Sequence, residues 1–112
     1  MKKTYLSFII PAKNEEGSLE ILYKEITEVV KKTGKTYEII FIDDGSTDKT
    51  YSIITNLHKI DPHVKAIRHR GNFGKSLALQ NGFDNAQGEI IFTMDADLQD
   101  NPKEIPNFLQ KK

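Results

Sequence analysis

The chain has 112 residues, with 16 basic and 16 acidic side chains, so its formal net charge is zero. This length fits one domain with its own core, and the even charge offers no basic surface of the kind that nucleic acid binding requires. Cysteine is absent, which excludes disulfides and thiolate metal sites, and no apolar run approaches the length of a membrane span, so we expect a cytoplasmic protein.

Apolar residues alternate between the periods of strands and helices along the chain. The predicted strands cover 5–10, 37–42, 64–68 and 89–94, and the predicted helices cover 18–34, about 47–60 and about 74–86. We expect Ser18 to cap the first helix, Gly34 to end it, and a turn with a short helix to follow Pro102. Strands that are apolar on both faces and alternate with helices predict an α/β fold: an open, mainly parallel, Rossmann-like sheet with helices on both faces.

Polar residues concentrate where the predicted strands end. Four polar segments follow the four strands in order: PAKNEE, DDGSTD, HRGNFGK and DADLQD. Ordinary loop sequences precede the strands. Because open α/β sheets bind ligands at the carboxyl ends of their strands, this edge of the sheet is the predicted site.

The segment DADLQD can be interpreted in two ways. Asp95 and Asp97, spaced two apart after a strand, suit one hard divalent cation, and Gln99 could add an oxygen ligand or orient a carboxylate. Alternatively, Asp100 or Asn101 caps the following turn and the other acids are solvated. The residues alone leave both interpretations open.

The segment DDGSTD is explained in part by local structure. Gly45 is expected to make the turn, and Ser46 or Thr47 is expected to cap the next helix. This interpretation leaves Asp43 and Asp44 unexplained. At the mouth of its strand, Asp43 is suited to hydrogen bonding with a nucleobase or a sugar.

The segment HRGNFGKS contains glycines and basic residues at the start of a predicted helix. Glycine permits close approach of the backbone to an anion, and Lys75 together with the helix end favours phosphate. The P-loop spacing fails, because His69 stands where glycine is required and Gly71 comes two residues late. The histidines at 58, 63 and 69 lack the spacing of metal ligands, and we expect them at the surface.

Together these segments resemble the family 2 glycosyltransferases, which have the GT-A fold. The matching stretches are PAKNEE, YEIIFIDDGSTDKT, GNFGKSLALQNGF and MDADLQDNPKEIP, which span nearly the whole chain. The resemblance is strongest to the polyprenyl-phosphate branch, which includes dolichol-phosphate and undecaprenyl-phosphate sugar transferases. It implies transfer of a sugar from a UDP- or GDP-sugar to a polyprenyl phosphate, with inversion and with Mg²⁺ or Mn²⁺ as cofactor.

The resemblance also implies roles for individual residues. The predicted nucleotide-sugar-binding residues are Pro11, Lys13, Glu15, Phe41, Asp43, Asp44, Lys75, Asp95 and Ala96, and the predicted metal ligands are Asp95, Asp97 and Gln99. Phe41 and Asp43 would lie beside the base, and Ala96 would approach the nucleotide through its backbone. Lys13 departs from the family pattern, because many relatives have tyrosine there. No catalytic base is assigned within the chain.

In the family, acceptor-binding strands and any membrane segments follow the D-x-D motif. We therefore expect residues 1–112 to be the donor-binding part of a domain, truncated shortly after that motif, which binds nucleotide without turnover. The longer protein would work in the cytoplasm or at the cytoplasmic face of a membrane. Strand 89–94 would be left at an edge, which predicts a homo-oligomer.

Three other classes of protein are alternatives for these residues. A Mg²⁺-dependent phosphotransferase of the haloacid dehalogenase kind uses D-x-D on an early strand, with threonine or valine where this chain has Gln99. A receiver domain would place its acidic pair after the first strand, whereas the pair here follows the second. A non-catalytic nucleotide-binding or assembly module remains open as the alternative that is not an enzyme.

Overall fold

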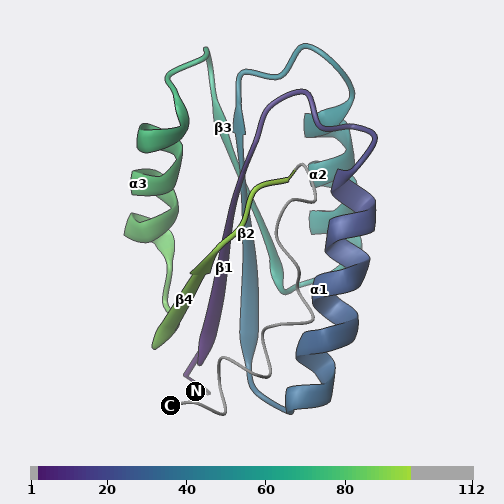
Figure 1. Cartoon of the computed structure of the whole chain (residues 1–112), viewed down its shortest axis with the longest axis vertical. Coiled ribbons are helices and arrows are strands. Elements are labelled where there is room, and N and C mark those ends of the chain that lie inside the picture. The colour runs from purple at the N-terminus through teal and green to yellow at the C-terminus, as the bar shows by residue number, and fades with distance from the viewer. Residues whose placement is uncertain (1–2, 97–112) are drawn as a thin grey trace.

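The computed structural model describes residues 3–96, which form a parallel sheet between helices (Figure 1). The strands are β1 (Leu6–Ala12), β2 (Tyr37–Asp44), β3 (Val64–His69) and β4 (Ile90–Thr93), and the helices are α1 (Leu19–Thr33), α2 (Thr50–Ile60) and α3 (Lys75–Asn85). The strand order is β3-β2-β1-β4, and every neighbouring pair is parallel. The predicted α/β fold with an open parallel sheet is confirmed.

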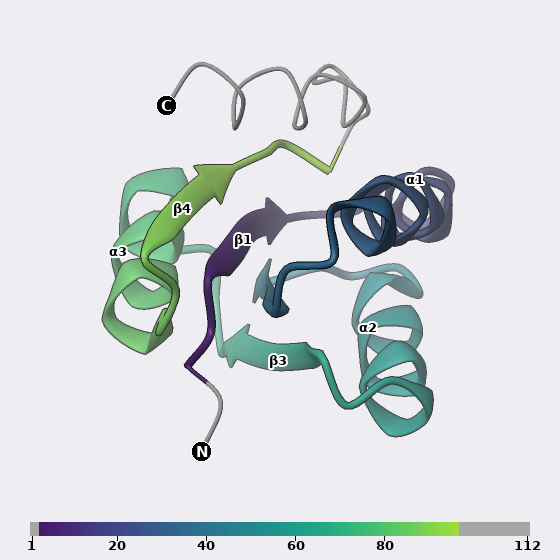
Figure 2. The same ribbon diagram turned by 90° about the horizontal axis from the view of Figure 1, so that it is seen from below.

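Helices lie on both faces of the sheet (Figure 2). Helix α3 packs against β1 and β2 on one face, while α1 and α2 cover the other. The larger core cluster lies on the α1 and α2 face, and the smaller one, under α3, consists of Ile9, Ile40, Ile42 and Ala78. Burial on both faces explains why the strands are apolar on both sides.

The strands extend further toward the site than the sequence predicted. Pairing of β1 with β2 continues through Pro11↔Ile42 and Ala12↔Asp43, so both strands run two residues beyond their predicted ends. As a result, both Asp43, which was expected at the mouth of the strand, and Asp44 belong to β2. Successive strand residues point to opposite faces, so the two carboxylates point in different directions.

Helix α1 begins and ends where it was predicted to, but its start lacks the expected capping bond. Gly34 has a φ of 69°, the left-handed conformation that commonly ends a helix and that glycine adopts without strain. Ser18 occupies the N-cap position, but its hydroxyl makes no capping bond and instead donates to the carbonyl oxygen of Ala96 at 2.5 Å. The start of α1 is therefore tied to the segment that leaves β4.

Helix α2 begins at Thr50, three residues after its predicted start. The predicted caps, Ser46 and Thr47, are wrong, because the N-cap position falls on Lys49. The carboxylate of Asp48 accepts hydrogen bonds from the backbone N–H of Thr50 at 2.9 Å and from its hydroxyl at 2.5 Å. The Asp48 carboxylate thus accepts the backbone hydrogen bond that a side chain at the N-cap position would usually accept.

Strand β4 lies at one end of the sheet formed by residues 3–96, as predicted. Pairing of this edge with a second copy of the chain stays a prediction. The predicted turn and helix after Pro102, and the residues Asp97, Gln99 and Asp100, lie outside the described residues. Within 3–96, no helix combines the length and the apolar character needed to cross a bilayer.

A buried carboxylate fastens the α3–β4 connection to the sheet. Glu38, only 4% exposed, accepts hydrogen bonds from the Ser7 hydroxyl at 2.6 Å and the Gln87 N–H at 2.7 Å, and pairs with the Lys65 ammonium at 2.6 Å. Burial by itself would raise the pKa of Glu38. The hydrogen bonds from Gln87, Lys65 and Ser7 and the charge of Lys65 outweigh burial and lower the pKa below its ordinary value of 4.5.

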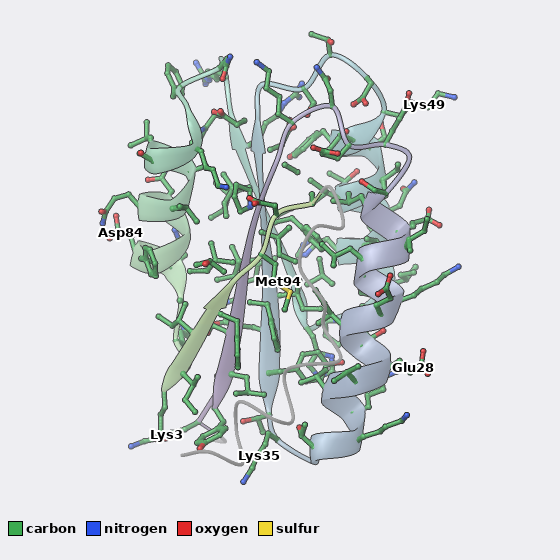
Figure 3. The ribbon with its side chains drawn as sticks, viewed as in Figure 1. Lys3, Glu28, Lys35, Lys49, Asp84 and Met94 are labelled. Atoms are coloured by element: carbon green, nitrogen blue, oxygen red, sulfur yellow. The ribbon has the colours of Figure 1, made fainter. Side chains whose placement is uncertain are left out.

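Replacing Glu38 by glutamine should lower the free energy of unfolding at neutral pH by about 2 kcal/mol, since the charge-assisted bonds are lost. The folded pKa is depressed, so the ionised carboxylate stabilises the fold above about pH 4.5 and loses this effect as the pH falls through the folded pKa. Urea unfolding of both proteins should show a gap in stability at neutral pH that closes in acid. The control is Glu28→Gln on the exposed side of α1 (Figure 3). A gap of constant size at every pH would contradict this account.

Candidate functional site

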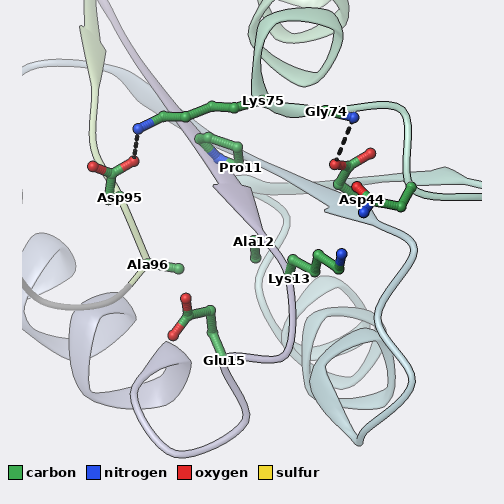
Figure 4. A pocket seen from close by; sticks show the side chains of 10 residues that line it. Pro11, Ala12, Lys13, Glu15, Asp44, Gly74, Lys75, Asp95 and Ala96 are labelled. Atoms are coloured by element: carbon green, nitrogen blue, oxygen red, sulfur yellow. Dashed lines mark hydrogen bonds and ion pairs between the residues drawn. The ribbon is translucent and has the colours of Figure 1, made fainter.

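A cavity of about 450 Å³ opens where β1, β2 and β4 end, at the predicted edge of the sheet (Figure 4). Seven of the predicted site residues line it: Pro11, Lys13, Glu15, Asp44, Lys75, Asp95 and Ala96. Three further lining residues, Ala12, Asn72 and Gly74, were not singled out from the sequence. Strand pairing brings these residues together, because β1 lies between β2 and β4.

Pro11 lies near the end of a central strand, where proline would normally interrupt the sheet. The carbonyl oxygen of Ile9 accepts a hydrogen bond from the N–H of Met94 at 3.0 Å, and the last pair between β1 and β4 is Ile9↔Thr93. The side chain of Met94 is buried in the core (Figure 3). Pro11 is two residues beyond Ile9, so its backbone nitrogen is directed toward the same side of β1, the side on which β4 lies. Because β4 has already ended at this level, the missing N–H of Pro11 interrupts no pairing.

Two lysines reach the cavity from different segments. Lys75, the first residue of α3, extends over Pro11 and pairs with the Asp95 carboxylate (Figure 4). The side chains of this pair are 59% and 33% exposed, so solvent screens the attraction. With its amide oriented to satisfy both partners, the Asn72 side chain accepts a hydrogen bond from the Lys13 ammonium.

The Asp44 carboxylate lies at the side of the cavity near the start of α3. It accepts hydrogen bonds from the backbone N–H groups of Phe73 at 2.9 Å and Gly74 at 3.0 Å, and from the His69 ring at 3.0 Å. The Asn72 amide donates a further bond at 2.9 Å. Burial would raise the pKa of Asp44, but the bonds from His69, Phe73 and Gly74 outweigh it and lower the pKa. Asp44 was predicted to bind the nucleotide, yet both of its oxygens are engaged within the protein.

His69 is buried, with 6% of its surface exposed, so its expected place at the surface is wrong. One ring nitrogen meets the carboxylate of Asp44, and the other lies 2.6 Å from the side-chain nitrogen of Asn81 on α3. His58 and His63 are exposed, as expected. The alternation of side chains along β3 could have indicated that His69 is buried. His69 comes two residues after Ile67, which packs against the core under α3, so both side chains point to the same face of the sheet.

Phe41 and Asp43 do not line the cavity. Phe41 is fully buried in the larger core, and its expected place beside the base stays a prediction. Asp43 is also without exposed surface; its Oδ1 accepts from the Ser46 N–H at 3.2 Å, while its Oδ2 has no hydrogen-bond partner among the described residues. The Arg68 Nε lies 3.7 Å from that oxygen, beyond hydrogen-bonding distance, and the Arg68 guanidinium stacks on Tyr51.

Asn14 joins the loop after β1 to the loop after β2. Its φ of 54° lies in the left-handed region, which asparagine tolerates better than most residues. Its side-chain oxygen accepts from the backbone N–H groups of Thr47 at 2.8 Å and Asp48 at 3.3 Å, while its own N–H donates to the Ser46 hydroxyl at 2.9 Å. These bonds tie together the two loops, a role that the sequence did not reveal, and the next residue, Glu15, is held by its own N–H, which donates to the Thr50 hydroxyl at 2.8 Å.

Gly45 brings the loop after β2 against the loop before α3. Its φ is 80°, and a Cβ atom there would lie 2.8 Å from the backbone carbon of Gly71 and 2.9 Å from the backbone nitrogen of Asn72. The sequence predicted Gly45 as a turn residue only. The structure adds a second requirement, because any side chain would push the two loops apart.

Asp95 presents carboxylate oxygens to the cavity, and such oxygens are the ligands that Mg²⁺ and Mn²⁺ prefer. Within residues 3–96, no group of three or more histidine or acidic side chains is close enough together to hold an ion. The other predicted ligands, Asp97 and Gln99, lie outside the described residues.

Replacing Asn14 by alanine should lower the free energy of unfolding by about 2 kcal/mol, because the variant loses an acceptor for two N–H groups and retains a left-handed φ. The matched variant Asn14→Gly loses the same acceptor without the backbone strain, and should cost about 1 kcal/mol. Urea unfolding of the three proteins measures both contributions. Equal stability of Asn14→Ala and the parent chain would refute the role given to this residue.

Solved structures share this fold. A mannosyltransferase from Pyrobaculum calidifontis, in complex with GDP-Man and Mn²⁺, superposes with a TM-score of 0.74 at 27% identity, over 87% of this chain and 28% of that one. The glucosyl-3-phosphoglycerate synthase of Mycobacterium tuberculosis, in complex with Mn²⁺, UDP and phosphoglyceric acid, has a TM-score of 0.67 at 26% identity, over 92% of this chain and 37% of that one.

Curated relatives match at higher identity. The undecaprenyl-phosphate 4-deoxy-4-formamido-L-arabinose transferase of Shewanella sediminis is 41% identical over 108 residues, which cover 96% of this chain and 33% of the relative. The transferase of the same name from Pectobacterium atrosepticum is 39% identical over 107 residues, which cover 94% of this chain and 32% of the relative. The chain thus spans about a third of the length of these relatives.

The family model for glycosyl transferase family 2 matches residues 7–112, from the first strand through the D-x-D segment. This range includes every residue that lines the cavity. The GT-A-like fold and the relatives agree with that match. The chain belongs to glycosyltransferase family 2.

Proposed function

We propose that the cavity binds the nucleotide part of a UDP- or GDP-sugar. In a protein of the relatives' length, the sugar would then pass to a polyprenyl phosphate with inversion. The observation that carries the proposal is the meeting of Lys75 and Asp95 at one cavity on the carboxyl edge of the sheet. A cation for phosphate and a carboxylate for a metal ion are the two groups that such a donor requires.

The protein's own cations are placed to receive a diphosphate. Lys75 begins α3, and its ammonium reaches the Asp95 side of the cavity, while the positive end of the helix lies on the opposite side; both favour an anion in the cavity. Lys13 lines the same cavity from the loop after β1. Glycine at position 74 leaves the approach to the helix end without a side chain. The volume of the cavity, about 450 Å³, is within the usual range for small-molecule sites.

A divalent ion fits the donor chemistry of this edge. Asp95 would hold it, with Asp97 and Gln99 as further ligands. When bound, Mg²⁺ or Mn²⁺ stabilises the negative charge that develops on a departing nucleoside diphosphate. Support comes from the solved relatives named above, whose complexes contain Mn²⁺ together with GDP-Man or with UDP.

A polyprenyl phosphate acceptor is supported by the relatives that are named undecaprenyl-phosphate transferases. A phosphate oxygen is already anionic, so its attack on the sugar requires little help from a general base. Attack from the face opposite the departing diphosphate inverts the anomeric carbon. A lipid acceptor would place the longer protein at the cytoplasmic face of a membrane.

Calorimetric titration of UDP and of GDP into the 112-residue chain, with and without Mn²⁺, tests the donor site. We expect one nucleotide to bind more tightly with Mn²⁺, because the ion neutralises the repulsion between Asp95 and the phosphates. Asp95→Asn should abolish this difference, whereas Asp84→Asn, on the outer side of α3 (Figure 3), should preserve it. A folded chain that binds neither nucleotide would refute the proposal, as would Mn²⁺-dependent binding that survives in Asp95→Asn.

Lys75→Met should weaken binding of the nucleoside diphosphate about tenfold, since a charge-assisted contact with phosphate is lost. Binding of the corresponding nucleoside should not change. Lys3→Met, at the opposite end of the sheet (Figure 3), is the matched control. An equal loss of affinity for nucleoside and diphosphate would show that Lys75 does not act on the phosphates.

A further inference from the structure

We propose that Asp44 and His69 form a buried anchor that fixes residues 70–74 and thereby holds Lys75 at the cavity. Both are positioning residues, which act through the loop and do not touch the ligand. The geometry alone supports the claim that the anchor fixes the loop. The part that Lys75 plays toward donor phosphates rests on the proposed function.

The first observation is that the Asp44 carboxylate is fully used. A carboxylate has about four acceptor positions, and Asp44 receives four donors: the N–H groups of Phe73 and Gly74, the His69 ring and the Asn72 amide. Three of these donors belong to the loop that leads into α3. Since Asp44 ends β2 inside the sheet, the loop is fastened to a rigid element.

The second observation is that His69 links the same carboxylate to α3. Its ring is buried between Asp44 and Asn81, and Asn81 belongs to the helix that begins with Lys75. With Nδ1 donating to Asp44, the other ring nitrogen accepts from the Asn81 amide. The anchor therefore holds the entry to α3 through Gly74 and the body of α3 through Asn81.

The third observation is that the loop's own sequence does little to define its shape. Gly71 and Gly74 give the backbone more freedom than other residues allow, and Gly74 has a φ of 96°. The N-cap position of α3 carries no capping side chain. Phe73 has 58% of its surface exposed, so packing of its side chain contributes little. Among the described residues, the four hydrogen bonds to Asp44 are joined by the close approach of Gly45 to Gly71 and Asn72, the Lys13–Asn72 bond and the contact between the His69 and Phe73 rings, so Asp44 supplies most of the polar contacts that set the loop.

Lys75 inherits its position from this loop. Its backbone follows Gly74 directly, and the N–H of Gly74 is bonded to Asp44 at 3.0 Å. Figure 4 shows the result: Asp44 holds Gly74 on one side of the cavity while the Lys75 side chain extends to Asp95 on the other. Loss of the anchor would let the start of α3 move and would spread Lys75 over many orientations.

NMR of the ligand-free chain tests the anchor without any nucleotide. His69→Leu should speed hydrogen exchange of the Phe73 and Gly74 amides about tenfold or more. It should also shift the NMR signal of the ¹³C-methylated Lys75 side chain toward the position that this signal has in Asp95→Asn. The signal is assigned by its disappearance in Lys75→Arg. His69→Asn keeps a donor near Asp44 and should restore both readouts. His58→Leu, a histidine on α2 at the far end of the sheet, is the control.

Two outcomes of this experiment would overturn the anchor. One is a folded His69→Leu protein with unchanged exchange at Phe73 and Gly74 and an unchanged Lys75 signal. The other is a change of the same size in His58→Leu. If His69→Leu does not fold, Asn81→Ala, which removes only the helix contact, must produce the same two changes.

A double-mutant cycle then tests whether the anchor acts through Lys75. His69→Leu should weaken binding of the nucleoside diphosphate at least about fivefold in the parent chain and leave it nearly unchanged in Lys75→Met. Full additivity would show that His69 does not act through Lys75. If the parent chain binds no nucleotide while His69→Leu still releases the loop, the proposed function fails and the anchor stands.

Discussion

Parallel pairing of β1 with β2 on one side and β4 on the other is the constraint that creates the site. It aligns the carboxyl ends of three strands at one edge of the sheet. Pro11, Asp44 and Asp95 are far apart in the chain, yet they line one cavity. Without this register, the polar segments that follow the strands would be separate loops with no shared chemistry.

The loops at this edge hold one another. Asn14 joins the loop after β1 to the loop after β2, and the close approach at Gly45 joins that loop to the one before α3. The helix behind them is also tightly placed, because a Cβ atom on Gly82 would lie 2.3 Å from the side chain of Ile9. The position of α3 on the sheet, and with it the start of the helix at Lys75, is therefore set by packing and hydrogen bonding together.

The charges at the cavity are largely compensated within the described protein. Lys75 pairs with Asp95, and Asp44 is satisfied by the loop before α3. A site with this balance suits a ligand that brings both an anion and a cation, which a nucleoside diphosphate with a divalent ion would do. An anion alone would be repelled by the carboxylates, and a cation alone would be repelled by the lysines.

The sequence by itself determined the alternation of strands and helices along the chain, the parallel sheet and the edge at which the cavity lies, because these follow from local periodicity and from the rule for strand ends. Seven residues of the cavity were also named from the sequence, most of them through the resemblance to the family 2 glycosyltransferases. Which polar groups meet was decided only by the tertiary structure. Asp44 and His69 are 25 residues apart and bond only because β2 and β3 pair in one register. The burial of Phe41 and the true start of α2 likewise depend on partners distant in the sequence, and a local pattern contains no information about such partners.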